Sequence, residues 1–165
     1  MKKDLHLLFQ KLTHGVYVIG VSCNGENNAF TASWVMQVSF TPLLLALSIN
    51  PDHSSYKMLK EGGVFSVNVL PKDRLDLAKH FALPVNTDKL AGVVWHPGKT
   101  TTPLLDDAIA FFECKFSHEC EAGDHRLVIG RIISGAMREP QALPMNYQDT
   151  GALDGSSSLF PEDFI

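Results

Sequence analysis

The sequence predicts a mainly β fold, a small antiparallel β-barrel with short helices at its edges. Extended segments outnumber helical ones and do not alternate regularly with helices, as the strands of a parallel sheet would. Residues 112–121 and 126–137 both have strand patterning and are joined by a short polar turn, which is typical of an antiparallel hairpin. The 165 residues show no internal repeat and are expected to form a single domain, residues 1–165.

The N-terminal third of the chain is expected to hold one short helix and three strands. Residues 5–12 follow Asp4, a suitable N-cap, and place leucine and phenylalanine at helical spacing. The next three segments are β-branched, aromatic or continuously apolar, and turn residues separate them. These segments are residues 15–22, 30–40 and 43–49. The third is apolar on both faces and is therefore expected at the centre of the sheet.

The middle of the chain is expected to contain two more helices and one more strand. Residues 54–60 begin with serine and are followed by two glycines, which predicts a helix of about two turns. A strand is expected over 64–70. Residues 73–82 have apolar side chains three and four positions apart, as in a small amphipathic helix. Residues 83–106 are expected to be rich in loops.

The C-terminal third is expected to be a hairpin followed by a tail. Over residues 112–121 the alternation places Cys114, His118 and Cys120 on one apolar face, while the glutamates face solvent. The acidic tail, residues 140–165, has an uncertain structure and is expected to be either disordered or docked on a partner.

Composition narrows the class of protein. The net charge of −4 gives no overall positive field, so nucleic acid is not an expected partner. No apolar run is long enough to span a membrane and no signal-peptide core opens the chain, so a cytoplasmic protein without membrane contact is expected. Three cysteines without a Cys-x-x-Cys pair are expected to be free thiols.

Four common catalytic motifs are absent: the Gly-x-Ser-x-Gly elbow, Gly-x-Gly-x-x-Gly, the Walker-type loop and His-Glu-x-x-His. The richest group of polar side chains would converge if the strand at 43–50 paired with the strand at 30–40. It would offer hydroxyls, an amide and one ammonium to a phosphomonoester. Its members are Thr31, Ser33, Ser39, Asn50, Ser54, Ser55 and Lys57. The alternative interpretation is that these serines and threonines only cap turns.

Several short motifs between residues 8 and 137 together resemble the flavin reductase-like family, which includes flavoredoxin-type small flavoproteins and the reductase components of two-component monooxygenases. No single motif is decisive, but their order and spacing are fairly specific. They are Thr31-Ala32-Ser33-Trp34, Gln37-Val38-Ser39-Phe40, Pro42-Leu43-Leu44, Ser48-Ile49-Asn50, residues 65–70 and Gly123-Asp124-His125. The resemblance implies an antiparallel split β-barrel, Greek-key-like, that binds FMN, is usually a homodimer and passes a hydride from NAD(P)H to flavin.

The resemblance also implies roles for individual residues. Residues 31–34 (Thr31, Ala32, Ser33, Trp34) resemble the segment along the flavin, and Ser39 matches a position near its phosphate or ribityl chain. Ser48, Ile49 and Asn50 resemble the strand end beside the ring, and Ser54 and Lys57 the phosphate side. His80, Phe81 and Ala82 correspond to a second flavin-contacting loop. His125 resembles a residue that meets the nicotinamide.

Other interpretations of these residues remain open. Trp34 is equally well explained as a core or interface residue, His125 as part of a polar turn, and Lys57 as a solvated helix residue. A metal site at Cys114, His118 and Cys120 is not expected, because a buried thiol usually behaves as a small apolar group.

Three functions compete at this point. The first is an FMN-dependent NAD(P)H oxidoreductase that passes electrons to free flavin, to an electron-acceptor protein or to a small molecule. The second is a non-catalytic FMN-binding electron carrier without a nicotinamide site, in which the loop at 83–103 or the acidic tail 154–165 fills the space over the flavin where nicotinamide would lie. The third is a structural dimerisation module. Flavin reduction requires positioning more than acid-base chemistry, which agrees with the lack of a conspicuous catalytic dyad.

Overall fold

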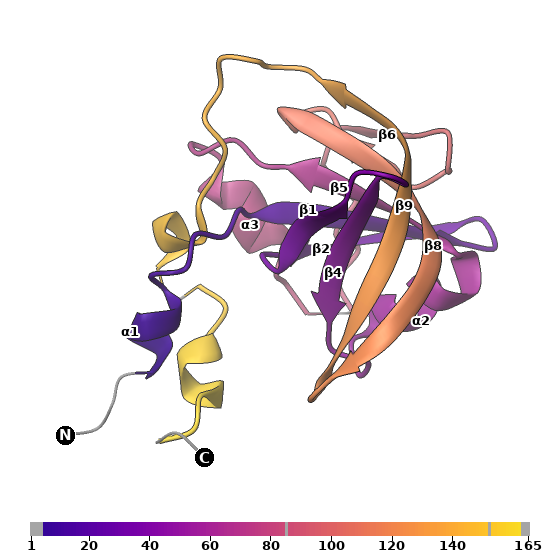
Figure 1. Ribbon diagram of the computed structural model, residues 1–165. Helices are drawn as coiled ribbons and strands as arrows, with labels where there is room; N and C mark the ends of the chain where they lie inside the picture. The colour runs from indigo at the N-terminus through magenta and orange to yellow at the C-terminus, as the bar shows by residue number, and fades with distance from the viewer. Residues whose placement is uncertain (1–4, 85, 152, 163–165) are drawn as a thin grey trace.

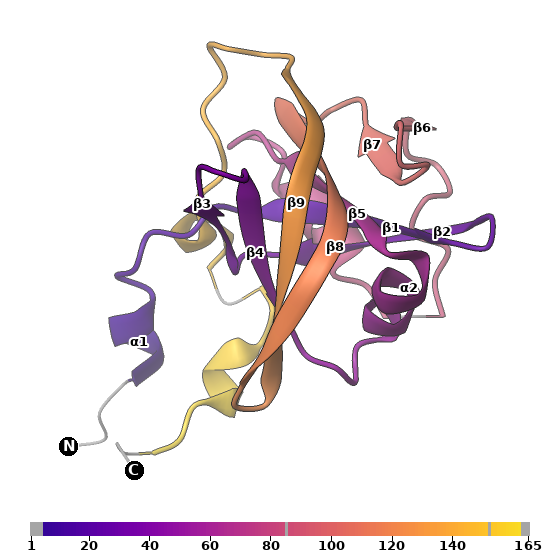
Figure 2. The ribbon, with the colours of Figure 1, turned by 45° about the vertical axis from the view of Figure 1, so that its right-hand side comes forward.

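A computed structural model of the chain describes residues 5–84, 86–151 and 153–162. Seven strands form one antiparallel sheet that curls around its core (Figures 1 and 2). In the order in which they lie side by side, they are β2 (Glu26–Ala32), β1 (Tyr17–Cys23), β5 (Val64–Val69), β8 (Ala110–Ala122), β9 (His125–Met137), β4 (Leu44–Ile49) and β3 (Val35–Ser39). The predicted mainly β, antiparallel fold is confirmed. Within the described residues the edge strands β2 and β3 do not pair with each other, so hydrogen bonds do not close the sheet into a barrel.

The predicted helices are present with small changes in length. They are α1 (Leu5–Phe9), α2 (Ser54–Gly62) and α3 (Leu75–Phe81). Helix α1 is shorter than expected, and its predicted N-cap Asp4 lies outside the described residues. The side chain of His53 caps α2 by accepting a hydrogen bond from the Ser55 amide, and Gly63 ends the helix with a φ of 66°. The loop-rich region contains a small ribbon of β6 (Trp95–Pro97) and β7 (Pro103–Leu105).

The single strand expected over 30–40 is wrong, because the chain forms two strands there. Asn24 and Gly25 have positive φ and make a tight hairpin turn, so β2 already begins at Glu26. At Ser33 and Trp34 the chain leaves β1 and joins β4 as β3. The segment therefore connects the two opposite edges of the curled sheet.

The central position expected for residues 43–49 is also wrong. Strand β4 lies second from the edge, between β9 and β3, and β8 is the middle strand of the seven. Strand β4 is still mostly buried, with Leu47 fully covered in the core. Because the sheet curls, a strand near its edge reaches the interior and has the apolar pattern of a central strand.

Strand β8 does not keep the clean alternation expected of it. Its pairing with β9 shifts register between Glu113 and Cys114 and again between Phe116 and His118. Glu113 is consequently buried, where it accepts hydrogen bonds from the Thr100 amide and hydroxyl at 2.8 Å each. Cys120 is exposed while Cys114 is buried, so the proposed shared face of these side chains does not exist.

The three cysteines are free thiols, as predicted. Burial raises the pKa of Cys114 to about 12, which makes it an inert apolar side chain. No helix in the described residues has the length and apolar character needed to cross a membrane.

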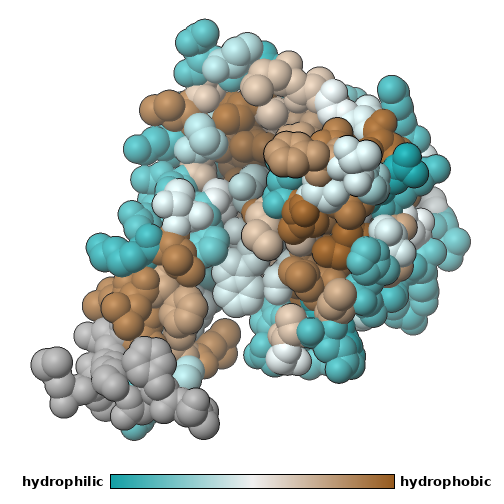
Figure 3. All heavy atoms as spheres, viewed as in Figure 1, coloured by the Kyte–Doolittle hydropathy of each residue, from teal (hydrophilic) through white to brown (hydrophobic). Residues whose placement is uncertain are grey.

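Helix α1 and the described part of the C-terminal tail form a lobe that stands out from the sheet (Figures 1 and 3). This terminal lobe consists of α1 and residues 147–151 and 153–161, which include the 3-10 turns η1 (Tyr147–Thr150) and η2 (Ser156–Leu159). The rings of Phe9 and Phe160 pack with centroids 5.3 Å apart, and the Gln148 side-chain amide donates to the carbonyl of Gln10. The described part of the tail is therefore docked on its own chain.

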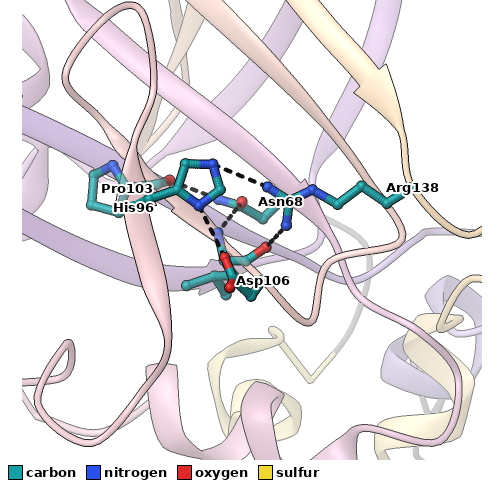
Figure 4. Close-up of polar contacts among 6 residues, drawn as sticks. Asn68, His96, Pro103, Asp106 and Arg138 are labelled. Carbon is teal, nitrogen blue, oxygen red and sulfur yellow. Dashed lines mark hydrogen bonds and ion pairs between the residues drawn. The ribbon is translucent and has the colours of Figure 1, made fainter.

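Asn68 joins three segments at the inner side of β5. Its amide nitrogen donates to the carbonyls of Val18 at 3.0 Å and Pro103 at 3.1 Å, and its oxygen accepts from the Leu105 amide at 2.9 Å. Figure 4 shows Asn68 and Pro103 close to the group of His96, Asp106 and Arg138. Asn68 has no exposed surface, so its hydrogen bonds have no water to replace them.

Replacing Asn68 with leucine is expected to lower the free energy of unfolding by about 2–4 kcal/mol, because buried backbone groups lose their partners. Equilibrium unfolding in urea measures the change. Asn86→Leu, at an exposed loop position, is the matched control and is expected to change stability by less than about 0.5 kcal/mol. Equal stability of the two variants would contradict this role of Asn68.

Candidate functional site

A pocket of about 330 Å³ lies between the terminal lobe and the rim of the sheet. We call it the terminal pocket. The rim contributes Ser33 and Trp34 from the β2–β3 connection and Asp124 and His125 from the β8–β9 hairpin tip. The lobe contributes mainly aromatic and polar side chains. These include His6, Phe9, Tyr147, Asp154 and Phe160, and His14, which follows α1, also lines the pocket.

Trp34 and His125 form the rim wall of the terminal pocket. Their ring centroids are 5.0 Å apart, and Trp34 keeps 48% of its surface exposed. The His125 Nδ1 and an Asp124 carboxylate oxygen are 2.8 Å apart, and this hydrogen bond holds the pKa of Asp124 below its usual range. An ionised Asp124 therefore fixes the orientation of the imidazole at the hairpin tip.

Asp154 brings a second carboxylate to the pocket from the lobe. It accepts from the Tyr147 hydroxyl at 2.8 Å and from the Ser156 amide at 3.0 Å. Burial is the main cause that raises the pKa of Tyr147, so the phenol remains a proton donor to this carboxylate. These contacts hold Asp154 in place within a segment that otherwise lacks long regular elements.

A second polar group, the helix-rim cluster, gathers where α2 begins. It comprises Asn28, His53, Ser54, Ser55 and Lys89. The Asn28 amide donates to the Ser55 hydroxyl at 3.3 Å. The Ser54 hydroxyl is buried and, within the described residues, has no hydrogen-bond partner. A buried hydroxyl without a partner is costly, and a ligand with acceptor atoms would satisfy it.

Lys89 supplies the cation of this cluster. Its side chain is almost fully buried, with 3% of the residue exposed, and its ammonium donates to the Phe81 carbonyl at 3.2 Å. Burial lowers the pKa of Lys89. Burial and then the nearby charge of Lys89 lower the pKa of His53. A buried ammonium with one carbonyl partner is well suited to pair with an anionic group.

Residues 31–34 run from the helix-rim side to the terminal pocket. At one end the Thr31 hydroxyl donates to the Ala78 carbonyl of α3 at 2.8 Å. At the other end Ser33 and Trp34 line the pocket, and the Ser48 amide donates to the Trp34 carbonyl at 3.0 Å. Ala32 lies between them as the last residue of β2.

The loop after α3 also reaches the helix-rim cluster. The His80 Nε2 and the Lys89 carbonyl oxygen are 2.7 Å apart, and Phe81 is fully buried while offering its carbonyl to the Lys89 ammonium. Ala82 is exposed at the end of the helix. His80 and Phe81 are thereby tied to Lys89.

Four other residues expected at the site neither line the terminal pocket nor belong to the helix-rim cluster. Ser39 ends β3, at the opposite end of that strand from Trp34. The Lys57 side chain is 81% exposed and pairs with Glu61 at 3.8 Å. Ile49 is buried in the core, and the exposed Asn50 accepts from the Asp52 amide at 2.9 Å. Their functional roles stay predictions from the resemblance.

Sequence reasoning gave no site role to Lys89, His53 and Asn28, or to the lobe residues Tyr147 and Phe160. It considered Asp154 only as the start of a tail that could fill the space over the flavin. A lysine in a loop-rich stretch carries no local signal of burial, because its burial depends on how the loop returns to α3. The acidic tail and its aromatic residues were visible in the sequence, but nothing local indicated that they face His125.

Chemically, the two groups suit one elongated ligand. Aromatic walls in the terminal pocket favour a planar ring, and the helix-rim cluster favours an anionic group. Among the described residues, no group of three or more His, Cys, Asp or Glu side chains is placed to hold a metal ion.

Comparison with known proteins gives consistent matches. Residues 9–155 match the flavin reductase like domain. The flavin reductase (NADH) of Kitasatospora aureofaciens is 36% identical over 126 residues, which cover 75% of this chain and 65% of the relative. A diflavin flavoprotein of Synechocystis sp. is 28% identical over 87% of this chain, which spans only 26% of that longer protein.

Among solved structures, an NADH:FAD oxidoreductase of Streptomyces globisporus C-1027 superposes with a TM-score of 0.81. It is 28% identical, and the match covers 88% of each chain. A second structure of that protein is described as a complex with NAD and FAD fragments.

Proposed function

We propose that this chain, which belongs to the flavin reductase-like domain family, is an NAD(P)H-dependent oxidoreductase that transfers hydride from a reduced nicotinamide to a flavin. The main support is the packing of Trp34 and His125 at the wall of a pocket. Residues 31–34 lead from this pocket to α3, where Thr31 donates to the Ala78 carbonyl and the buried Lys89 donates to the Phe81 carbonyl. A relative named as a flavin reductase and a superposable NADH:FAD oxidoreductase add support.

We propose FMN as the preferred flavin. Ser54, with its unpartnered buried hydroxyl, and Lys89, with its buried ammonium, fit a phosphomonoester. The extended segment 31–34 spans about 10 Å, a length suited to a ribityl chain between ring and phosphate. We propose that Thr31, Ala32, Ser33, Trp34, His80 and Phe81 border the flavin and that Lys89 replaces Lys57 as the countercharge.

When bound, the flavin supplies a ring that accepts the hydride. The contribution of the chain is to bind, orient and exclude water. Trp34 and His125 form one wall of the pocket with their rings tilted by 55° to each other, and Asp124 holds the His125 ring in one orientation. The terminal lobe lines the other side of the pocket.

The proposed activity is tested by mixing the purified protein anaerobically with FMN and either NADH or NADPH. Loss of flavin absorbance is expected much faster than with free FMN and nicotinamide alone. If FMN binds but neither nucleotide reduces it faster than that reference, the protein is the electron carrier considered above and the reductase proposal is wrong. If no flavin binds, both proposals fail and a structural role remains.

We further propose that the protein is a homodimer and delivers electrons to a separate acceptor. The chain spans about a quarter of the diflavin flavoproteins it matches, and another relative is named as a monooxygenase reductase component. Large apolar side chains are exposed on β3 and the turn after it, with Met36 60% and Phe40 83% exposed. Next to them, the strands around β8 and β9 leave an apolar groove of about 400 Å³. A second copy would cover these surfaces.

The double variant Met36→Asp, Phe40→Asp is expected to raise the dimer dissociation constant at least about 30-fold, because charges enter an apolar interface. Sedimentation velocity over a concentration series measures it. Leu159→Asp is the matched control, since Leu159 is also 83% exposed but lies on the terminal lobe. A wild-type protein that stays monomeric at high concentration would contradict the proposal.

A further inference from the structure

The terminal pocket has an unbalanced set of charges. Asp124 and Asp154 both line it, whereas none of its lining residues in the described ranges is a lysine or an arginine. Asp124 is kept ionised by its hydrogen bond with His125, which lowers the pKa of the carboxyl group. Three histidines, His6, His14 and His125, are the basic groups of the lining.

The position of Asp154 is fixed by its surroundings. The Tyr147 hydroxyl and the Ser156 amide each donate to one of its oxygens, and the Tyr147 hydroxyl also lies 3.0 Å from the Ser156 hydroxyl. The carboxylate therefore cannot swing away without breaking two hydrogen bonds. Each oxygen still has a lone pair that can accept from a further hydroxyl.

NADH and NADPH differ by one phosphate on the adenosine ribose. A site that takes NADPH pairs this phosphate with arginine or lysine, while a carboxylate accepts hydrogen bonds from the free ribose hydroxyls of NADH. A carboxylate facing the phosphate would repel it, and like charges opposed in a binding site are strongly unfavourable. The carboxylates of the terminal pocket thus suit the ribose hydroxyls of NADH and oppose the additional phosphate of NADPH.

We infer that the terminal pocket selects NADH over NADPH, and that Asp154 on the terminal lobe is the specificity-determining residue. The inference rests on the proposed function and extends it, because it names which reduced nicotinamide the pocket accepts. The tail of the chain thereby becomes part of the substrate site.

Steady-state kinetics with both nucleotides test the inference at pH 8, where an ordinary imidazole is neutral. The wild-type protein is expected to have a kcat/KM for NADH at least about tenfold above that for NADPH. Asp154→Lys is expected to lower this ratio at least about tenfold, mainly by decreasing the KM for NADPH. Added salt is expected to narrow the wild-type ratio, because it screens the repulsion.

Glu26→Lys is the matched control, since it makes the same change of charge at an exposed position in the β1–β2 hairpin. It is expected to leave the ratio within about twofold of wild type. Binding of NAD⁺ and NADP⁺ to the flavin-free protein, measured by titration calorimetry, gives a readout that does not depend on turnover. Tighter binding of NAD⁺ is expected, with the difference reduced in Asp154→Lys.

Three results would overturn the inference. Equal or better use of NADPH by the wild-type protein contradicts it while leaving the proposed reductase function intact. An equal decrease in kcat/KM for both nucleotides in Asp154→Lys means that Asp154 only stabilises the tail and does not select the nucleotide. Failure to oxidise or bind either nucleotide, with FMN bound, contradicts the reductase function as well.

Discussion

Replacing Lys89 with methionine is expected to weaken FMN binding by about 30- to 100-fold, while riboflavin binding stays within about threefold. Lys89 is 3% exposed and its ammonium has a carbonyl, not a carboxylate, as its partner within the described residues. A hydrogen bond to a charged group contributes about 1.5–3 kcal/mol. Only FMN carries the phosphate, so the loss should be confined to it. Flavin fluorescence titrations of the two ligands measure the difference.

The comparison with Lys57 makes this experiment decisive for the phosphate side. Lys57→Met removes a charge from a side chain that is 81% exposed and paired with Glu61. It is expected to leave the affinities for FMN and riboflavin within about twofold of wild type. A selective loss of FMN affinity in Lys57→Met, with no loss in Lys89→Met, would favour Lys57, the residue named by the resemblance. Lys89→Arg keeps the charge and is expected to retain most FMN affinity, which separates charge from packing.

Much of the fold was predictable because several elements are specified locally. The β8–β9 hairpin joins two strand-patterned segments at a turn that contains Gly123, and α2 lies between the capping residue His53 and Gly63. Local pattern did not reveal the break at Ser33 and Trp34, because an extended residue is compatible with either neighbouring strand. The sheet position of β4 and the register shifts in β8 likewise depend on partners far away in sequence.

The candidate site was partly predictable for a different reason. The motif at residues 31–34 and the Gly123-Asp124-His125 turn were singled out from the sequence, and the structure brings Ser33, Trp34 and His125 to one pocket. Lys89 was not identified, and Asp154 was considered only as the start of a tail that could fill the space over the flavin, because their positions depend on how a loop and a tail return to the sheet. Short motifs indicate which strands border the site, whereas the path of the loop and the tail decides which charged side chains face those strands.

Replacing His125 with alanine is expected to lower kcat/KM for NADH about 100-fold and to leave the dissociation constant of FMN within about threefold. His125 packs against Trp34 at the wall of the terminal pocket and is oriented by Asp124. Loss of its ring removes one boundary of the space where the nicotinamide would stack. Misplacement of reacting groups by about 1 Å is enough to cost two orders of magnitude in rate. Stopped-flow measurement of anaerobic flavin reduction isolates this step from later oxidation.

His96 provides a matched control within the same chain. It pairs with Asp106 at 2.9 Å, much as His125 pairs with Asp124 at 2.8 Å, but it lies beside Arg138 and does not line the terminal pocket (Figure 4). His96→Ala is expected to keep the reduction rate within about twofold, since a surface hydrogen bond of this kind affects stability only slightly. Asp124→Asn is expected to cause an intermediate loss, about tenfold, because it leaves the ring in place but weakens its orientation. If His125→Ala and His96→Ala reduce flavin equally fast, His125 does not position the nicotinamide.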